Sequence, residues 1–150
     1  MNHLREDVHI HASAQRVYRH ITSSRAVWLP RAFRHVSAHD DTLCFELALP
    51  LRRERARLAV TTSQSPSLLV LERDSAADEG GVIDSLTWAL HEETPEEVHV
   101  TLEAGYRPAG GPLGALLESA LYEPLRRQAF RDALWRLKRF VEADDAGGWA

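Results

Sequence analysis

Cysteine is almost absent from this 150-residue chain, which has only Cys44. One cysteine cannot form an internal disulfide, and it has no CxxC partner with which to build a thiolate metal site. A chain of this length can nevertheless bury enough surface to fold as one domain without disulfides or a metal. Cys44 lies in an apolar, strand-like run. Because the chain cannot form an internal disulfide, we expect a reducing, cytoplasmic environment.

Long apolar runs are also missing. No stretch of about eighteen uninterrupted apolar residues occurs, and the opening residues MNHLREDVHIH lack the apolar segment of a secretion signal. We therefore expect no membrane span.

Positive charge is not in excess, because 18 basic and 22 acidic residues give a formal charge of −4. Without an overall positive field we expect no nucleic-acid partner. Lysine is scarce, since Lys138 is the only one, and we attribute the abundance of arginine to GC-rich coding rather than to a role for each guanidinium.

The motifs of several enzyme classes are absent too. No GxSxG marks a nucleophilic serine, and the glycine pairs at 80–81 and 110–111 match neither GxGxxG nor GxxxxGK[ST]. These absences argue against a serine hydrolase and against nucleotide binding, and we expect no cofactor.

The first third of the chain predicts a strand and two short helices. Residues 4–11 alternate apolar and polar side chains with the period of a half-buried strand. Ser13 then occupies an N-cap position, and the apolar spacing after it predicts a helix that ends near Thr22. A second helical turn, SRAVWLP, must stop at Pro30, because proline has no amide donor.

Six more strands and a long helix follow. Short polar turns separate the strand-like runs AFRHVSA, TLCFELAL, ERARLAVTT, SLLVLER, GVIDSLTWALHE and EVHVTLEAGY, which predicts an antiparallel meander. Apolar residues then recur at helical spacing over residues 113–142, where Pro124 predicts a kink or break near Ala120. The helical face that we expect to be apolar contains Leu113, Leu117, Leu121, Leu125, Phe130, Leu134, Leu137 and Val141.

This order of elements resembles the START-like superfamily, also called SRPBCC or helix-grip. The most specific stretches are DVHIHASAQRVYRHITSSRAVWLP and GPLGALLESALYEPLRRQAFRDALWRLKRFVE. The resemblance implies an α+β fold in which a curved seven-stranded antiparallel sheet surrounds a long C-terminal helix. It also implies a functional range from lipid carriers to polyketide cyclase/dehydrase enzymes, which often use arginine and tyrosine inside the pocket. We expect the domain to cover residues 1–142, followed by a flexible tail at 143–150.

A cavity between such a sheet and helix is expected because one straight helix cannot fill the concave side of a curled sheet. The predicted inward strand faces are mostly hydrocarbon, which suits a lipid, polyketide, quinone or similar molecule. The side chains that we expect to contact the ligand are Phe45, Leu58, Asp84, Leu86, Trp88, Leu102, Tyr106, Leu117, Leu121 and Tyr122.

Asp84 and Tyr106 are the candidate catalytic residues. Asp84 shares a predicted face with apolar neighbours, where a charge is costly unless it is paired or close to solvent. It either orients or protonates a ligand or is a wet strand-end residue, and Glu6 shows the same pattern on the first strand. Trp88, Tyr106 and Tyr122 could grip a flat ligand or simply belong to the core.

The remaining candidates have structural interpretations. Trp28 is expected to pack the short helices against the sheet. His9 and His11 share a strand face that His99 could join, but no further ligands arrive with recognisable spacing, so we expect a solvated face and no metal. The arginines at 52, 53, 55 and 57 indicate a hairpin turn and an outward strand face.

Three functions remain open from the sequence. The first is the binding of a hydrophobic small molecule. The second is a polyketide cyclase or dehydratase activity in which a pocket acid or tyrosine moves protons. The third is an interaction domain that acts through a homodimer or a protein partner.

Overall fold

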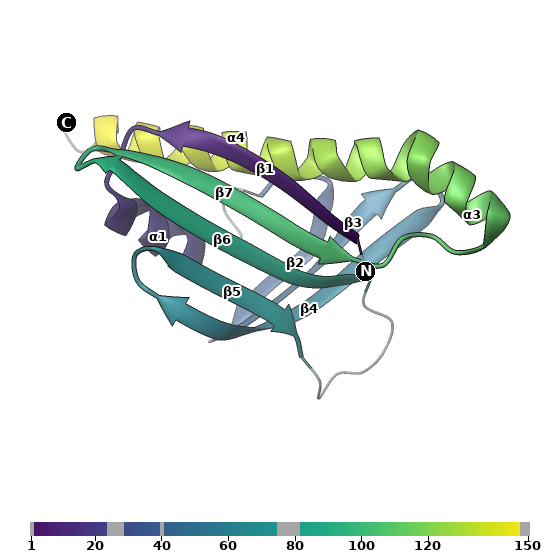
Figure 1. The fold of residues 1–150 in the computed structure, drawn as a ribbon. Coiled ribbons are helices and arrows are strands. Elements are labelled where there is room, and N and C mark those ends of the chain that lie inside the picture. Colours follow the sequence, from purple (N-terminus) through teal and green to yellow (C-terminus); the bar gives the residue numbers. More distant parts are fainter. Residues whose placement is uncertain (1, 24–28, 40, 75–81, 148–150) are drawn as a thin grey trace.

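A seven-stranded antiparallel sheet dominates the structure. The computed structural model describes residues 2–23, 29–39, 41–74 and 82–147. The strands lie side by side in the order β1-β7-β6-β5-β4-β3-β2, and the sheet curls beneath a long helix (Figure 1). The predicted α+β helix-grip architecture is therefore confirmed. The strand bounds are β1 Asn2–Ile10, β2 Phe33–His39, β3 Thr42–Leu49, β4 Arg52–Gln64, β5 Leu68–Arg73, β6 Ile83–Thr94 and β7 Glu97–Tyr106.

The alternation of apolar and polar residues decides which sheet face is buried. Along β3, for example, Leu43, Phe45 and Leu47 are buried while the residues between them are only partly buried. Successive side chains of a strand point to opposite faces, so one face of the sheet forms the core. Most residues predicted to point inward are buried as expected, and Val60 is only partly buried.

The first helix, α1, spans Ala14–Ser23 and begins at the predicted cap. The hydroxyl oxygen Oγ of Ser13 accepts a hydrogen bond from the Arg16 amide at 3.2 Å. This bond satisfies one of the free N–H groups of the first turn. Most of the predicted second helical turn SRAVWLP, including Trp28, lies at residues 24–28, outside the described residues, and the described Leu29 and Pro30 are not helical.

The C-terminal helix is continuous but irregular. It consists of α3 (Gly111–Leu117), a π-helical turn η1 (Glu118–Tyr122) and α4 (Glu123–Gly147). The irregular turn contains Ala120, whose carbonyl would be the α-helical partner of Pro124, and Pro124 has no N–H to donate. The irregularity predicted near Ala120 is thus a wide turn instead of a break. The helix also continues past the predicted end at Glu142.

The predicted apolar face is correct for the second half of the helix and wrong for the first half. Leu113 and Leu125 are 69% and 37% exposed, and Leu117 and Leu121 are only partly buried. At 3.6 residues per turn, a residue five positions before Phe130 lies about 140° away around the helix, whereas one four positions before lies about 40° away. Arg126, and not Leu125, therefore shares the buried face of Phe130.

Candidate functional site

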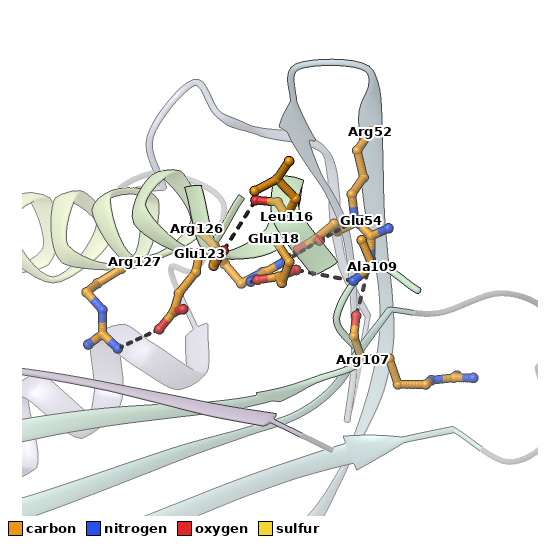
Figure 2. Close-up of polar contacts among 10 residues, drawn as sticks. Arg52, Glu54, Arg107, Ala109, Leu116, Glu118, Glu123, Arg126 and Arg127 are labelled. Atoms are coloured by element: carbon orange, nitrogen blue, oxygen red, sulfur yellow. Dashed lines mark hydrogen bonds and ion pairs between the residues drawn. The ribbon is translucent and has the colours of Figure 1, made fainter. Parts of the chain in front are cut away.

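A completely buried arginine lies between the C-terminal helix and the sheet. Arg126 of α4 has no exposed surface, and neither does Glu54 of β4. Two hydrogen bonds join them, from Arg126 Nε to Glu54 Oε1 at 2.7 Å and from Nη2 to Glu54 Oε2 at 2.6 Å. Nη1 and Nη2 also donate to Glu118 of η1, at 2.7 and 2.9 Å. One guanidinium thus clamps two carboxylates, as Figure 2 shows.

Arg52 completes this group, which we call the Arg126 cluster (Arg52, Glu54, Glu118 and Arg126). Arg52 Nε donates to Glu54 Oε2 at 2.7 Å, and its Nη2 donates to the carbonyl of Arg107 at 3.2 Å. Glu118 additionally accepts the amide of Ala109 at 3.3 Å. Two positive and two negative side chains balance, so the cluster buries no net charge, and its hydrogen bonds offset part of the cost of removing the ions from water.

Two tyrosines flank the cluster. The guanidinium carbon of Arg126 lies 3.9 Å from the ring centroid of Tyr106, and that of Arg52 lies 5.6 Å from the ring centroid of Tyr122. Both contacts are within cation–π range. Burial raises the pKa of the Tyr106 hydroxyl, and the positive charge of Arg126 only partly offsets that effect. Tyr106 therefore remains a phenol at neutral pH and can donate a hydrogen bond.

The ionised forms of Glu118 and Arg126 are favoured. Burial by itself would raise the pKa of Glu118, but hydrogen bonds from Arg126 and Ala109 and the nearby positive charges hold that pKa below its ordinary value. Burial would likewise lower the pKa of Arg126, yet its bonds to Glu54 and Glu118 raise it further above its already high value. Because four of the five guanidinium donors are occupied within the protein, a ligand carboxylate would have to replace one glutamate.

An apolar pocket lies on the same side of the sheet. Its lining is almost entirely hydrocarbon and consists of Leu29, Phe33, Leu43, Phe45, Leu86, Trp88, Leu102, Phe130 and Ala133. The rings of Phe33 and Phe45 are 5.2 Å apart and those of Phe33 and Phe130 are 5.4 Å apart, so the aromatic side chains occupy most of the space. The cavity measures only about 20 Å³. That is room for about one water molecule.

The pocket and the Arg126 cluster are neighbours along α4, and β7 leads from the pocket to Tyr106 beside the cluster. On α4, Ala133 and Phe130 line the pocket, and Arg126 lies about one helical turn before Phe130 in the sequence. On β7, Leu102 lines the pocket, and Tyr106 follows two inward positions later. The buried interior therefore passes from a hydrocarbon wall to a polar, charge-balanced end.

The structure brings only some of the predicted ligand contacts together. Phe45, Leu86, Trp88 and Leu102 line the pocket. Leu58 is buried but is not among the lining residues, and Leu117 and Leu121 are partly buried on the helix before the cluster. Tyr106 and Tyr122 are buried beside the cluster, against Arg126 and Arg52. The ligand roles of all ten predicted residues, inside the pocket lining and outside it, stay predictions.

Asp84 lies apart from the pocket lining. It is buried at an irregularity of β6, where the pairing with β7 shifts between Ile83 and Ser85. Its carboxylate approaches Arg107 Nε at 3.3 Å and Arg73 Nη1 at 3.8 Å. Glu6 is similarly paired, with Arg131 Nη2 at 3.2 Å. Ion pairs with arginines thus compensate both of the charges that stood out on the predicted inward faces.

Sequence reasoning missed the Arg126 cluster. No inward arginine was predicted. The basic run at 52–57 was assigned to a hairpin turn and an outward strand face, which is correct for the exposed arginines at 53, 55 and 57, whereas Arg52 turns inward to Glu54. Two signals were available. Glu54 shares the two-residue period of the buried Ala56 and Leu58, and Arg126 lies four residues before Phe130. Charges of opposite sign on two apolar faces that pack together indicate a buried ion pair.

Comparisons with known proteins confirm the fold. No protein-family model and no curated protein matches the sequence. A Thermus thermophilus protein, TTHA0849, superposes with a TM-score of 0.75 at 17% identity, covering 95% of this chain and 99% of its own. The Zhui aromatase/cyclase of a Streptomyces species gives 0.68 at 11% identity, covering 94% and 93%.

A third similar structure is the Aha1 dimer from Colwellia psychrerythraea, with a TM-score of 0.62 at 13% identity, covering 95% of this chain and 97% of that one. At these identities the similarity shows the fold alone, which is the helix-grip fold. Among the described residues, no helix is both long and apolar enough to cross a membrane.

Proposed function

We propose that the protein binds a hydrophobic small molecule, such as a lipid, polyketide or quinone, between its curved sheet and its C-terminal helix. The observation that carries this proposal is the direct succession of apolar pocket and Arg126 cluster on α4 and β7. Ligand sites are typically apolar with a few polar groups that fix orientation. The hydrocarbon part of the ligand would occupy the pocket, and a polar end would face the Tyr106 hydroxyl.

Binding must enlarge the pocket. The cavity of about 20 Å³ is far below the roughly 300–1,000 Å³ of common small-molecule sites. The space has to come from the lining side chains, of which Leu29 is only partly buried and the aromatic rings are the largest. The ligand would therefore select a form of the protein with a more open pocket.

The test begins with protein purified from its own host and analysed by native mass spectrometry for a bound small molecule. In parallel, thermal unfolding is measured against lipids, quinones and polyketide-like aromatics, since a ligand at a hundredfold excess over its Kd stabilises by about 2.7 kcal/mol. Ala133→Leu fills the pocket from the helix side. Ala129→Leu, also at a buried helix position but outside the pocket lining, is the matched control.

The expected result is a shift in Tm that Ala133→Leu removes and Ala129→Leu retains, with both variants folded by circular dichroism. If neither a co-purified mass nor any shift in Tm appears across the panel, the binding proposal is wrong. If the two variants lose binding equally, the ligand lies elsewhere than in this pocket.

A second candidate function is catalysis of the cyclase or dehydratase type. The specific observation in its favour is the buried Tyr106 phenol stacked under Arg126, and a similar structure is that of an aromatase/cyclase. A phenol of raised pKa suits proton donation to a ligand oxygen more than proton abstraction. Tyr106→Phe should abolish turnover of an aromatic polyketide while binding persists. Asp84→Asn tests the other candidate acid, and unchanged turnover in both variants would reject this function.

A third candidate is association of two copies of the chain. Leu51, at the tip of the β3–β4 hairpin, and Leu113 and Leu116 of α3 are 103%, 69% and 63% exposed. Leu51 is next to Arg52 in the sequence, and Leu116 lies two residues before Glu118, so these exposed leucines lie near the Arg126 cluster along the chain. One similar structure is a dimer. Sedimentation at several concentrations tests this function. A dimer that Leu51→Ser with Leu116→Ser dissociates supports it, and a monomer at all concentrations rejects it.

A further inference from the structure

Histidines from neighbouring strands meet on the outer face of the sheet. The register pairs His9 of β1 with His99 of β7 and pairs His99 in turn with His91 of β6. The residues adjacent to His9 and His99 in sequence, such as Val8 and Val98, are buried on the opposite face. The imidazoles therefore lie across the sheet from the pocket and the Arg126 cluster.

The donor atoms of His9, His99 and Glu93 are close enough to share one ion. His99 Nδ1 lies 2.9 Å from His9 Nε2, while Glu93 Oε1 lies 3.7 Å from His99 Nδ1 and 3.5 Å from His9 Nδ1. In a tetrahedral zinc site with bonds of about 2.0–2.1 Å, neighbouring ligand atoms are about 3.3 Å apart. The contacts of His9 use its two different ring nitrogens, Nε2 toward His99 and Nδ1 toward Glu93, and one imidazole gives an ion only one of them. One ligand atom from each of the three residues nevertheless lies within 4.8 Å of the other two, so side-chain rotations that bring these atoms to about 3.3 Å would complete the geometry.

Further carboxylates surround the three donors. Asp7 Oδ2 lies 3.2 Å from His99 Nε2, so it can accept a hydrogen bond from the N–H of that nitrogen and leave the lone pair of Nδ1 directed at His9. A carboxylate that orients a histidine in this way is the usual partner of a metal-bound imidazole. Glu97 Oε1 lies 3.5 Å from His9 Nδ1 and adds negative charge. The arrangement attracts a cation and restricts the orientation of its donors.

We propose that His9, His99 and Glu93 form a binding site for one divalent transition-metal ion, with Asp7 as the positioning residue of His99. Two imidazoles and a carboxylate suit Zn²⁺ and its neighbours better than Mg²⁺ or Ca²⁺, which prefer oxygen ligands alone. Three protein ligands leave a fourth position for water or for Glu97. The ion would tie β1 to the β6–β7 hairpin.

Isothermal titration of the full, tag-free chain with ZnCl₂ tests the proposal. We expect one equivalent of Zn²⁺ to bind. His99→Asn and Glu93→Gln should weaken binding by at least about tenfold, and Asp7→Asn by about 10–100-fold, the usual effect of removing an orienting partner. The control is His39→Asn, an exposed histidine at the end of β2, at the opposite edge of the sheet, which should bind as the unmodified chain does.

A second readout separates the site from scattered surface histidines. In ¹H–¹⁵N spectra of the imidazoles, Zn²⁺ should shift His9 and His99 and leave His39 unchanged, and MgCl₂ should shift none of them. The proposal is overturned if no saturable binding is found up to millimolar Zn²⁺, or if the cluster variants and the His39 control bind equally. The thermal stability of the metal-free variants is compared first, so that lost binding is not confused with lost folding.

Discussion

The guanidinium of Arg126 stacks on the ring of Tyr106, 3.9 Å from its centroid, while Glu54 and Glu118 hold its edges. These contacts hold the side chains at the polar end of the buried interior, beyond the apolar pocket. Stacking and bidentate hydrogen bonds together leave the guanidinium little freedom to move. The polar end of the interior is thus preorganised.

Removing the buried positive charge should be strongly destabilising. Arg126→Met keeps most of the side-chain volume but removes the cation that Glu54 and Glu118 share, which leaves Glu54 with Arg52 and Glu118 with the Ala109 amide. We expect the free energy of unfolding to fall by about 3–5 kcal/mol. Urea unfolding followed by circular dichroism measures it. Arg139→Met, an exposed position on the same helix, should change stability by less than about 0.5 kcal/mol. A loss below about 1 kcal/mol for Arg126→Met would show that the ion pairs of Arg126 contribute little to stability.

Replacing Arg126 together with Glu54 and Glu118 should recover much of the stability that Arg126→Met loses. In a triple variant, Glu54→Met, Glu118→Met and Arg126→Met remove the three fully or almost fully buried charges at similar volume. Arg52 loses its carboxylate partner in this variant but keeps a 22% exposed side chain. Buried ion groups replaced by apolar ones are often neutral or more stable by about 1–4 kcal/mol. We therefore expect the triple variant to unfold at a higher urea concentration than Arg126→Met alone. If it is stable but no longer binds the ligand of the unmodified chain, the cluster serves binding rather than folding.

Acid should weaken the fold through Glu118. Its pKa is lower in the folded chain than the ordinary value of 4.5, so its stabilisation is fully present above about pH 4.5 and is lost as the pH falls below that value. Unfolding measured between pH 7 and pH 3 should show a decline that Glu118→Gln makes shallower. The remaining slope includes a contribution from Glu142. Burial by itself would raise the pKa of Glu142, but the hydrogen bonds from the His11 amide and from Lys138 outweigh that effect and lower it. An identical slope in both proteins would contradict the assignment.

Truncating an aromatic lining residue should open the pocket. Phe45 is buried against Phe33, and Phe45→Ala should cost about 3–5 kcal/mol of stability because it removes buried surface and leaves a cavity. Dry apolar cavities take up small apolar molecules. Saturating benzene should therefore raise the Tm of Phe45→Ala more than that of the unmodified chain. Arg139→Ala, at an exposed residue of α4, is the control and should change neither quantity. Equal benzene responses would mean that the pocket closes after truncation.

Local patterns in the sequence determined the architecture. Two-residue alternation gave the strands and their buried faces, Ser13 began α1, and Pro124 marked the irregular turn of the long helix. These signals are readable because they depend on neighbours within a few residues along the chain. They also placed Phe45, Leu86, Trp88 and Leu102 in one interior, where the structure forms its pocket.

Tertiary structure decided everything that depends on elements far apart in sequence. Whether the charge of Arg126 is buried or solvated depends on Glu54, 72 residues away, which arrives only when β4 packs beneath the helix. Glu93 joins His9 and His99 only through the pairing of β1, β7 and β6. The pocket is small because three phenylalanine rings from β2, β3 and α4 converge, and side-chain packing of that kind has no periodic signature in the sequence.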